Sequence, residues 1–171
     1  MTIEQPTDYL VPDLLDYQLK LVFCGTAPSR ASAAAQAYYA KPGNKFWPTL
    51  YAVGMTPRRF APVEYAQLLL LKIGLTDLCK VHAGNDDELP DGAFDIAAFQ
   101  KKIRQYQPQW VAFTSKNAAQ AALQHPVSYG SQAERIGHTQ CFVLPSPSGL
   151  ATKFFRIEPW AELADYYRQL K

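Results

Sequence analysis

The stretch Leu19–Cys24, LKLVFC, runs directly into Gly25–Ser29, GTAPS, and together they set the expected architecture. An almost continuous apolar run of this kind is typical of a strand that is buried on both faces, as in a parallel sheet. A glycine-led turn after such a strand exposes backbone N–H groups, and nests of this kind bind anions or the polar edges of ligands. The sequence therefore predicts a central strand whose carboxyl end carries a ligand-binding turn.

Comparable patterns continue along the chain and alternate between strand and helix. Further strands are predicted at 73–78, 110–114 and 140–144, and helices at 31–39, 44–53, 63–71, 95–106, 116–123 and 158–170. This alternation favours an α/β domain with a mainly parallel sheet between helical layers. We expect a three-layer α/β/α sandwich with a sheet of about four strands. Residues 1–171 are expected to form a single domain, in which residues 1–17 are an N-terminal extension.

Function is expected in the loops that leave the carboxyl ends of these strands. In open α/β sheets, ligands bind outside these ends. The connections concerned are 25–29, 76–78, 114–116 and 145–150. Candidate functional residues in these four loops therefore belong to one site.

Length and composition exclude several classes of protein. The chain has 171 residues, of which 48% are apolar and 19% charged, so it is not a disordered or highly charged tail. The net charge of +2, from 17 basic and 15 acidic residues, excludes a histone-like polycation but leaves room for a local basic face that binds nucleic acid. No stretch approaches the ~20 apolar residues of a membrane span, and no secretory signal is visible at the N-terminus.

Neither the cysteines nor the acidic residues form a metal-binding pattern. Cys24, Cys79 and Cys141 are widely spaced and odd in number, so they are interpreted as reduced, mostly buried thiols of a cytoplasmic protein. A metal-dependent hydrolase would have to use the acidic run 85–91, NDDELPD, which has no histidine partner nearby. We interpret this run as a solvated acidic loop and expect no metal and no cofactor.

The segment after the first turn places aromatic residues close to the nest. Thr26 and Ala27 lie in the turn, and Tyr39 and Asn44 follow at short range. Aromatic faces beside exposed N–H groups suit a flat heterocycle, which can be stacked and hydrogen-bonded at its edge. The neighbouring aromatic residues are better explained as core, and a core position also stays open for Tyr39.

A second segment, Leu144–Leu150 (LPSPSGL), predicts a rigid loop because prolines bracket small polar residues. Ser146 and Ser148 offer hydroxyl and N–H groups to phosphates. Gly149 and Leu150 form an apolar tip, and an exposed leucine on a rigid loop can wedge into a stack of bases. The alternative for Leu150 is a simple hydrophobic contact.

A third segment, Gly74–Leu78 (GLTDL), places Asp77 among apolar neighbours at a predicted strand end. A carboxylate in that position could hold water and take a proton from it. A helix-capping or turn role is the alternative.

These segments, in this order and spacing, resemble the uracil-DNA glycosylase superfamily, and within it the mismatch-specific uracil/thymine branch. The resemblance rests on VFCGTAPS (22–29), YYAKPGNKFW (38–47), GLTDL (74–78) and VLPSPSGL (143–150), and it extends from about Leu19 to the final helix. It implies a monofunctional DNA N-glycosylase that flips uracil out of DNA, above all from G·U mismatches, and hydrolyses it to leave an abasic site. It also implies a monomer that needs no cofactor and whose partner is double-stranded DNA, with single-stranded DNA left open.

One departure from the family pattern bears on the mechanism. Where this chain has Ala27, mismatch-specific members carry an Asn that holds the attacking water, and alanine cannot bind or activate water. The resemblance leaves Asp77 as the first candidate for that role. Asn44, which matches an Asn of the hypoxanthine-DNA glycosylase branch, is the second. Ser146 stands where the most active uracil branch has a His, and the cysteines of the iron–sulphur branches are absent.

The expected site can be given residue by residue. Catalytic roles are expected for Asp77 and Asn44, and base binding for Thr26, Ala27, Tyr39, Asn44 and Ser146. DNA contacts are expected from Ser29, Ser32, Ser148, Gly149, Leu150 and Lys153. Two alternatives stay open: a hypoxanthine-directed glycosylase, and a non-catalytic module that binds damaged DNA after losing hydrolysis.

Overall fold

A five-stranded sheet forms the centre of the computed structural model, which describes residues 6–171. The strand order is β2-β1-β3-β5-β4, with β1 (Leu21–Gly25), β2 (Ile73–Asp77), β3 (Trp110–Phe113), β4 (Gly130–Ile136) and β5 (Thr139–Val143). Strands β1, β2, β3 and β5 run parallel, and every residue of β1, β2 and β3 is buried. The predicted central strand is confirmed, because β1 has a parallel neighbour on each side.

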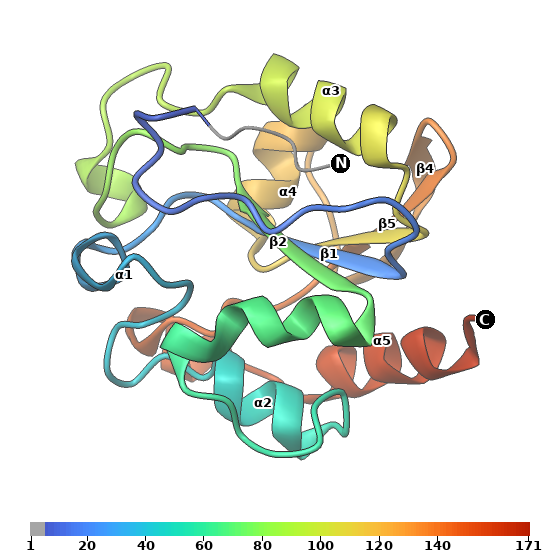
Figure 1. Cartoon of the computed structure of the whole chain (residues 1–171). Coiled ribbons are helices and arrows are strands. Elements are labelled where there is room, and N and C mark those ends of the chain that lie inside the picture. Colours follow the sequence, from blue (N-terminus) through green and yellow to red (C-terminus); the bar gives the residue numbers. More distant parts are fainter. Residues whose placement is uncertain (1–5) are drawn as a thin grey trace.

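Helices cover both faces of this sheet. Figure 1 shows α3 (Ile96–Tyr106) and α4 (Lys116–Leu123) over one face, and α2 (Phe46–Ala52) and α5 (Glu158–Gln169) over the other. The remaining helices are α1 (Arg30–Ala35) and the 3-10 helices η1 (Pro62–Leu71), η2 (Asp86–Glu88) and η3 (Gly149–Phe154). The expected three-layer sandwich is confirmed, and among residues 6–171 no helix is long and apolar enough to cross a membrane.

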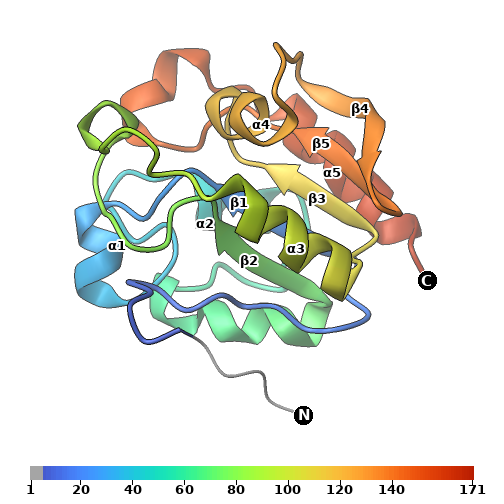
Figure 2. The same cartoon turned by 90° about the horizontal axis from the view of Figure 1, so that it is seen from above.

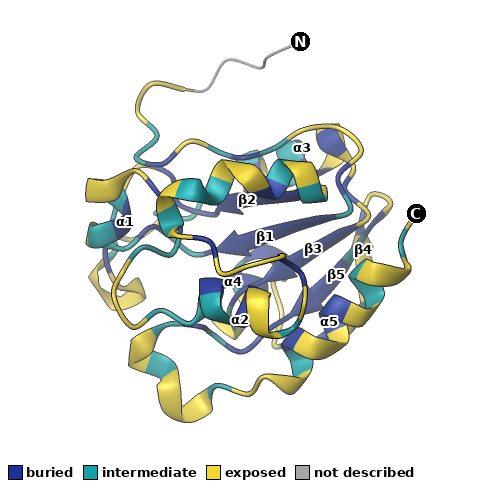
Figure 3. Cartoon of the chain, turned by 60° about the horizontal axis from the view of Figure 1, so that its bottom comes forward, coloured by how far each residue is buried: buried dark blue, intermediate teal, exposed yellow. Residues whose placement is uncertain are grey.

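Two apolar cores fill the spaces between the layers. Phe23, Phe46 and Trp160 belong to the core on the α2 and α5 side, and Phe99 and Phe113 to the core under α3 and α4. Figure 3 shows the result: the central strands β1, β2 and β3 are buried, and the helices are exposed on their outward sides. The sheet is therefore a rigid base, and its loops are the part of the molecule that can meet a ligand.

Short polar side chains fix where the helices begin. The Asp95 carboxylate accepts the N–H of Ala98 at 3.0 Å at the start of α3. The Ser115 hydroxyl accepts the N–H of Ala118 at 3.0 Å at the start of α4. These caps satisfy N–H groups that have no partner within the first helical turn. The predicted range 116–123 therefore coincides with α4.

The sequence-based expectations need three corrections. The sheet has five strands rather than about four, because β4 is an edge strand whose residues alternate between exposed and more buried and so lack an apolar run. The predicted helix at 31–39 ends at Ala35, where Gln36 takes up a left-handed conformation with φ of 50°. The predicted helix at 63–71 is a 3-10 helix.

The N-terminal extension covers the outer edge of β2. Leu14 and Leu75 exchange two backbone hydrogen bonds of 2.9 Å in an antiparallel bridge. Val11 and Leu14 are buried against the domain. An edge strand covered in this way cannot pair with another chain. Residues 1–5 of the predicted extension lie outside the described residues.

Candidate active site

A pocket of about 450 Å³ opens at the carboxyl ends of the parallel strands. All four predicted loops contribute to its wall, for example through Thr26, Asp77, Thr114 and Ser146. Figure 2 shows α1, the lime-green segment around η2 and the orange η3 at the same end of the sheet. The predicted site residues that line the pocket are Thr26, Ala27, Ser29, Tyr39, Asn44, Asp77, Ser146, Ser148 and Leu150.

Asp77, the last residue of β2, lies at the floor of the pocket and is only 5% exposed. The backbone N–H of Gly25 donates a hydrogen bond to its carboxylate. Burial raises the pKa of Asp77 to about 7, against the opposing effects of Lys80 and of this hydrogen bond. A carboxyl group that titrates near neutral pH can take a proton from water and release it again, as a general base must.

Gly25 is glycine because three polar side chains converge on its Cα. It lies opposite Asp77 in the pairing of β1 with β2. A Cβ at this position would lie 2.7 Å from Asp77 Oδ1 and 3.3 Å from both Thr114 Oγ1 and the Tyr39 hydroxyl. Any larger residue would push the carboxylate out of place. The glycine that opens the GTAPS turn therefore shapes the pocket floor as well as the turn.

Tyr39 forms a wall of the pocket and is fixed at both ends. Its ring stacks on Phe46, with centroids 3.9 Å apart and planes 17° apart, and its hydroxyl pairs with Thr114 Oγ1 at 3.1 Å. Burial raises the pKa of Tyr39 well above its usual range, so the phenol stays neutral. One ring face is covered by Phe46, which leaves the other for a flat ligand. The backbone of Tyr39 is left-handed, with φ of 53°.

Asn44 joins the pocket to the start of α2. Its Oδ1 accepts the N–H of Phe46 at 2.9 Å, which satisfies a free N–H group of the first helical turn. With the carbonyl oxygen engaged in this way, the side-chain NH₂ is the group that can donate to a ligand in the pocket. Asn44 is therefore better placed to hydrogen-bond a carbonyl oxygen than to take a proton from water.

The loop 146–150 is held rigid by its own serines. Ser146 Oγ accepts the N–H of Ser148, and Ser148 Oγ accepts the N–H of Leu150, each at 3.2 Å. The Leu150 side chain is 68% exposed although it also lines the pocket rim. Lys45 ties the loop to α2 by donating its N–H to the carbonyl of Pro147 at 2.8 Å. The predicted apolar tip on a rigid loop is thus present in the structure.

The acidic loop forms a second part of the rim, which the sequence did not indicate. Asp86 accepts the hydroxyl of Thr26 at 2.6 Å and the side-chain amide of Asn117 at 2.7 Å. Asp86 and Asp87 are exposed and line the pocket mouth. Thr26 and Asp86 are 60 residues apart, so no local pattern could have revealed the contact. Among the described residues, no three His, Cys, Asp or Glu side chains cluster in a way that could hold a metal ion.

Three predicted DNA contacts do not line the pocket: Ser32, Gly149 and Lys153. Ser32 is only 2% exposed, and its hydroxyl accepts the N–H of Ala40 at 3.0 Å, so it supports the loop after α1 and cannot reach a phosphate. Ser29 caps α1 by accepting the N–H of Ser32 and stays on the pocket wall. Lys153 is exposed on η3, with its ammonium group 5.0 Å from the centroid of the Phe154 ring. We therefore remove Ser32 from the expected DNA contacts.

Comparison of the chain with models of known protein families identifies the family to which it belongs. The family model of the Uracil DNA glycosylase superfamily matches residues 12–171. The chain belongs to this superfamily. Membership identifies a glycosylase-type hydrolase that acts on DNA, and the matched range includes every residue that lines the pocket.

A solved structure supports the fold independently. The solution NMR structure of a provisionally named uracil DNA glycosylase from Methanosarcina acetivorans is similar to this chain, with a TM-score of 0.62 at 21% sequence identity. The similarity covers 93% of this chain and 97% of that protein. The layer arrangement described above is therefore shared by a protein with little sequence in common.

Proposed function

We propose that this protein is a monofunctional DNA N-glycosylase that removes uracil, with G·U mismatches as the preferred context. The observation that supports this most strongly is Asp77, a buried carboxyl with a pKa of about 7 at the floor of a pocket of about 450 Å³. The bond between base and sugar is inaccessible inside a duplex, so the base must leave the stack before it can be cleaved. The cost of that step is a few kcal/mol and is lower at a mismatch.

The rim supplies the contacts that hold the DNA open. The exposed side chain of Leu150 can enter the vacated stack and offset part of the unstacking cost. Ser29, Ser148 and the backbone of Gly149 lie where flanking phosphates can accept hydrogen bonds, and Lys153 adds positive charge nearby.

The pocket wall supplies the contacts that recognise the base. The free face of the Tyr39 ring stacks on the flipped base, and its position is fixed by Phe46 and Thr114. The Asn44 amide donates to a carbonyl oxygen of the base. Backbone N–H groups of the turn at Thr26 and Ala27, together with Ser146, surround the rest of its polar edge.

The chemical step divides between the sugar and the base. The bond between C1′ and N1 breaks, its electron pair leaves with the base, and the sugar becomes an oxocarbenium-like cation. Asp77 in its ionised form stabilises that cation and takes one proton from water, while the hydroxide adds to C1′. The departing uracil anion spreads its charge over two carbonyl oxygens, where the Asn44 amide and the turn stabilise it, before N1 is protonated.

Ala27 explains why the carboxylate is needed. Ala27 lies in the pocket wall and offers no polar side chain to a water molecule. Asp77 is the only carboxylate among the described pocket residues that is buried, because Asp86 and Asp87 are exposed at the mouth. The role of holding the attacking water therefore falls to Asp77.

Hypoxanthine is the second candidate substrate. Asn44 supports it, because its free amide donor faces the pocket and hypoxanthine also presents a carbonyl oxygen. The same scaffold would flip inosine in place of deoxyuridine, with the same role for Asp77.

One assay separates these functions. Labelled oligonucleotides carry uracil, hypoxanthine or thymine opposite each normal base, in double- and single-stranded form, and alkali reveals the abasic sites. We expect the fastest cleavage for uracil opposite guanine. If hypoxanthine is released faster than uracil, hypoxanthine is the substrate. Tight binding without any abasic product would identify a non-catalytic module.

A further inference from the structure

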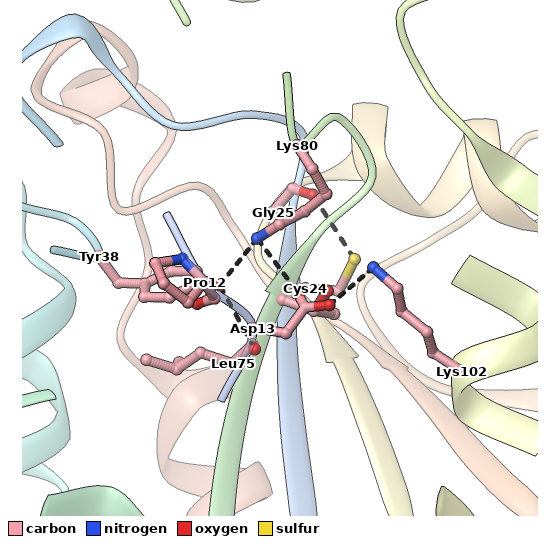
Figure 4. Close-up of polar contacts among 9 residues, drawn as sticks. Pro12, Asp13, Cys24, Gly25, Tyr38, Leu75, Lys80 and Lys102 are labelled. Atoms are coloured by element: carbon pink, nitrogen blue, oxygen red, sulfur yellow. Dashed lines mark hydrogen bonds and ion pairs between the residues drawn. The ribbon is translucent and has the colours of Figure 1, made fainter. Parts of the chain in front are cut away.

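A buried cluster of charged side chains lies beside β2, outside the wall of the pocket. The Asp13 carboxylate contacts Lys80 Nζ at 3.0 Å and Lys102 Nζ at 2.7 Å, as Figure 4 shows. The side chains of Asp13 and Lys80 are only 4% and 6% exposed. The three residues come from the N-terminal segment, the loop after β2 and α3, so the cluster joins parts that are distant in sequence.

Lys80 is held in one place by its neighbours. Its Nζ donates to the hydroxyl of Tyr38 at 2.9 Å, and it lies 5.2 Å from the centroid of the Tyr38 ring and 5.4 Å from that of Tyr9. The Tyr38 hydroxyl in turn donates to the carbonyl of Pro12 at 3.0 Å (Figure 4). An ammonium group with an ion pair, a hydrogen bond and two aromatic faces around it has a fixed position. Its electrostatic effect on nearby groups is therefore fixed as well.

The cluster reaches the pocket floor through β2. Thr76 donates its hydroxyl to Asp13 Oδ1 at 2.7 Å, and the next residue in the strand is Asp77. Of the charged groups around Asp77, Lys80 acts on it most strongly. The hydrogen bond from Thr76 thus places the ion cluster beside the end of β2, one residue before the pocket carboxylate, and Lys80 follows Asp77 by three residues.

Stability alone does not account for this cluster. Buried ion pairs lose the solvation of both charges, and apolar residues of the same size are often at least as stabilising. Here two ammonium groups face one carboxylate, so the cluster carries a net positive charge, and Thr76 ties it to the end of β2. A positive charge close to a carboxyl group favours its ionised form.

We propose that Lys80, clamped by Asp13 and Tyr38, is a positioning residue that keeps Asp77 in its proton-accepting, ionised form near neutral pH. The inference rests on the proposed function, in which Asp77 is the general base. Lys80 itself touches neither the pocket nor the substrate; among described residues, the pocket wall does not include it.

The groups that face Asp77 act on it in known directions. Lys80 and Lys102 lower the pKa of Asp77, whereas burial and Asp13 raise it. Cys24, Tyr38 and Tyr39 also lie near Asp77. Burial raises the pKa of each of them well above its usual range, so they stay neutral near pH 7. Near neutral pH the charged neighbours of Asp77 are therefore Lys80, Lys102 and Asp13, and they act together with burial, which has the largest effect, and with the hydrogen bond from Gly25.

A direct test follows the carboxyl carbon of Asp77 by NMR during a pH titration, with Asp77→Asn used to assign the signal. We expect Lys80→Met to raise the pKa of Asp77 by about one unit or more, because a close opposite charge is lost. Asp13→Asn should lower it, because a like charge is lost. A purely structural role would loosen the site in both variants, admit water and lower the pKa of Asp77 in both. That result would overturn the proposal.

Single-turnover base release gives a second measurement. With the pKa raised by one unit, Lys80→Met should release base roughly fivefold more slowly at pH 7 and at the wild-type rate at pH 9. A shift in the NMR titration with an unchanged pH–rate profile would leave the electrostatic role of Lys80 intact and show that Asp77 is not the base. The two measurements thus distinguish failure of this inference from failure of the proposed function.

A more conservative variant covers the case in which Lys80→Met does not fold. Lys102 is partly exposed, with an 18% exposed side chain, so Lys102→Met leaves the buried Lys80–Asp13 pair in place. It should raise the pKa of Asp77 in the same direction but by less. Lys80→Arg, which keeps the charge, should retain the wild-type profile. An unchanged Asp77 titration in Lys102→Met, or a raised pKa in Lys80→Arg as large as that expected for Lys80→Met, would contradict the proposal.

Discussion

The floor and the rim of the pocket are built in opposite ways. The floor is the end of β2, where Asp77 is buried, hydrogen-bonded to Gly25 and backed by an ion cluster. The rim consists of η2 and η3, two short 3-10 helices whose side chains are exposed, among them Leu150 and Asp86. A buried strand end can hold a reacting group in place, whereas exposed side chains on loops are the part of the molecule that can meet DNA. The contrast agrees with the proposed function, in which the floor carries the chemistry and the rim binds DNA.

The largest expected effect is on the rate, through the floor. Asp77→Asn removes the proton acceptor with little change in volume, so base release in single-turnover assays should fall by about 10²–10⁴-fold. Binding of uracil-containing DNA, measured by fluorescence anisotropy, should stay close to wild type. Asp91→Asn, at an exposed residue outside the pocket wall, is the matched control and should keep most of the activity. Wild-type cleavage by Asp77→Asn would remove the distinction between floor and rim.

The same variant should be more stable than the wild type, in a pH-dependent way. The pKa of Asp77 is about 7 in the folded protein and near 3.8 when unfolded, so folding favours its protonated form. Below about pH 4 the carboxyl group is protonated in both the folded and the unfolded protein, so the wild type and the variant differ little in stability. Between pH 4 and 7 the unfolded chain releases the proton while the folded protein keeps it, and the wild type loses stability. Asp77→Asn avoids this loss and should gain up to about 4 kcal/mol at pH 8. Urea unfolding at pH 4 and pH 8 measures it, and an equal gain at both would refute the assignment.

At the rim, the expected effects are smaller and depend on the DNA. Leu150→Ala removes the side chain that fills the vacated stack, so uracil release from duplex DNA should slow about tenfold, an effect of about 1.4 kcal/mol. Single-stranded DNA has no stack to fill, and its cleavage should change little. The comparison is made with one oligonucleotide, alone and annealed. An equal loss on both substrates would mean that Leu150 acts within the pocket.

The smallest effect is expected for charge at the rim. Lys153→Ala should weaken DNA binding without altering the rate of the bound complex. The slope of log affinity against log salt concentration should fall by about one, as expected for one lost phosphate contact. Lys101→Ala on α3, over the sheet face opposite α2 and α5, is a suitable control. If the salt dependence of affinity had the same slope in both variants, the DNA would not contact Lys153.

The parts of the fold that could be predicted from the sequence are those with a local signal, such as an apolar run or a capping residue. Strand β1 is an unbroken apolar run, and α4 begins after a serine that caps it, so both were recognisable. Strand β4 was not, because its sequence GSQAERI has one face in solvent and no apolar run. Local signals therefore identified the buried elements and missed the exposed edge.

The site shows the same limit. The pocket positions of Asp77 and Leu150 could be predicted because each stands out from its neighbours, a carboxylate among apolar residues and a leucine among small polar ones. The contacts of Asp86 with Thr26 and of Asp13 with Lys80 join residues far apart in the chain, so only the folded structure reveals them. Ser32 was misassigned because a serine near a turn can equally face solvent or bind the backbone.

The pairing of Leu14 with Leu75 gives the first stretch of the chain an unexpected importance. It delivers the Asp13 carboxylate to two lysines that would otherwise repel each other in the interior. Deletion of the N-terminal extension up to residue 14 would therefore remove the counter-ion of both lysines. A synthetic peptide of that segment, added to the truncated protein, should restore the ion pairs. The segment before β1 thereby supplies the carboxylate of a buried ion cluster whose two lysines come from elsewhere in the chain.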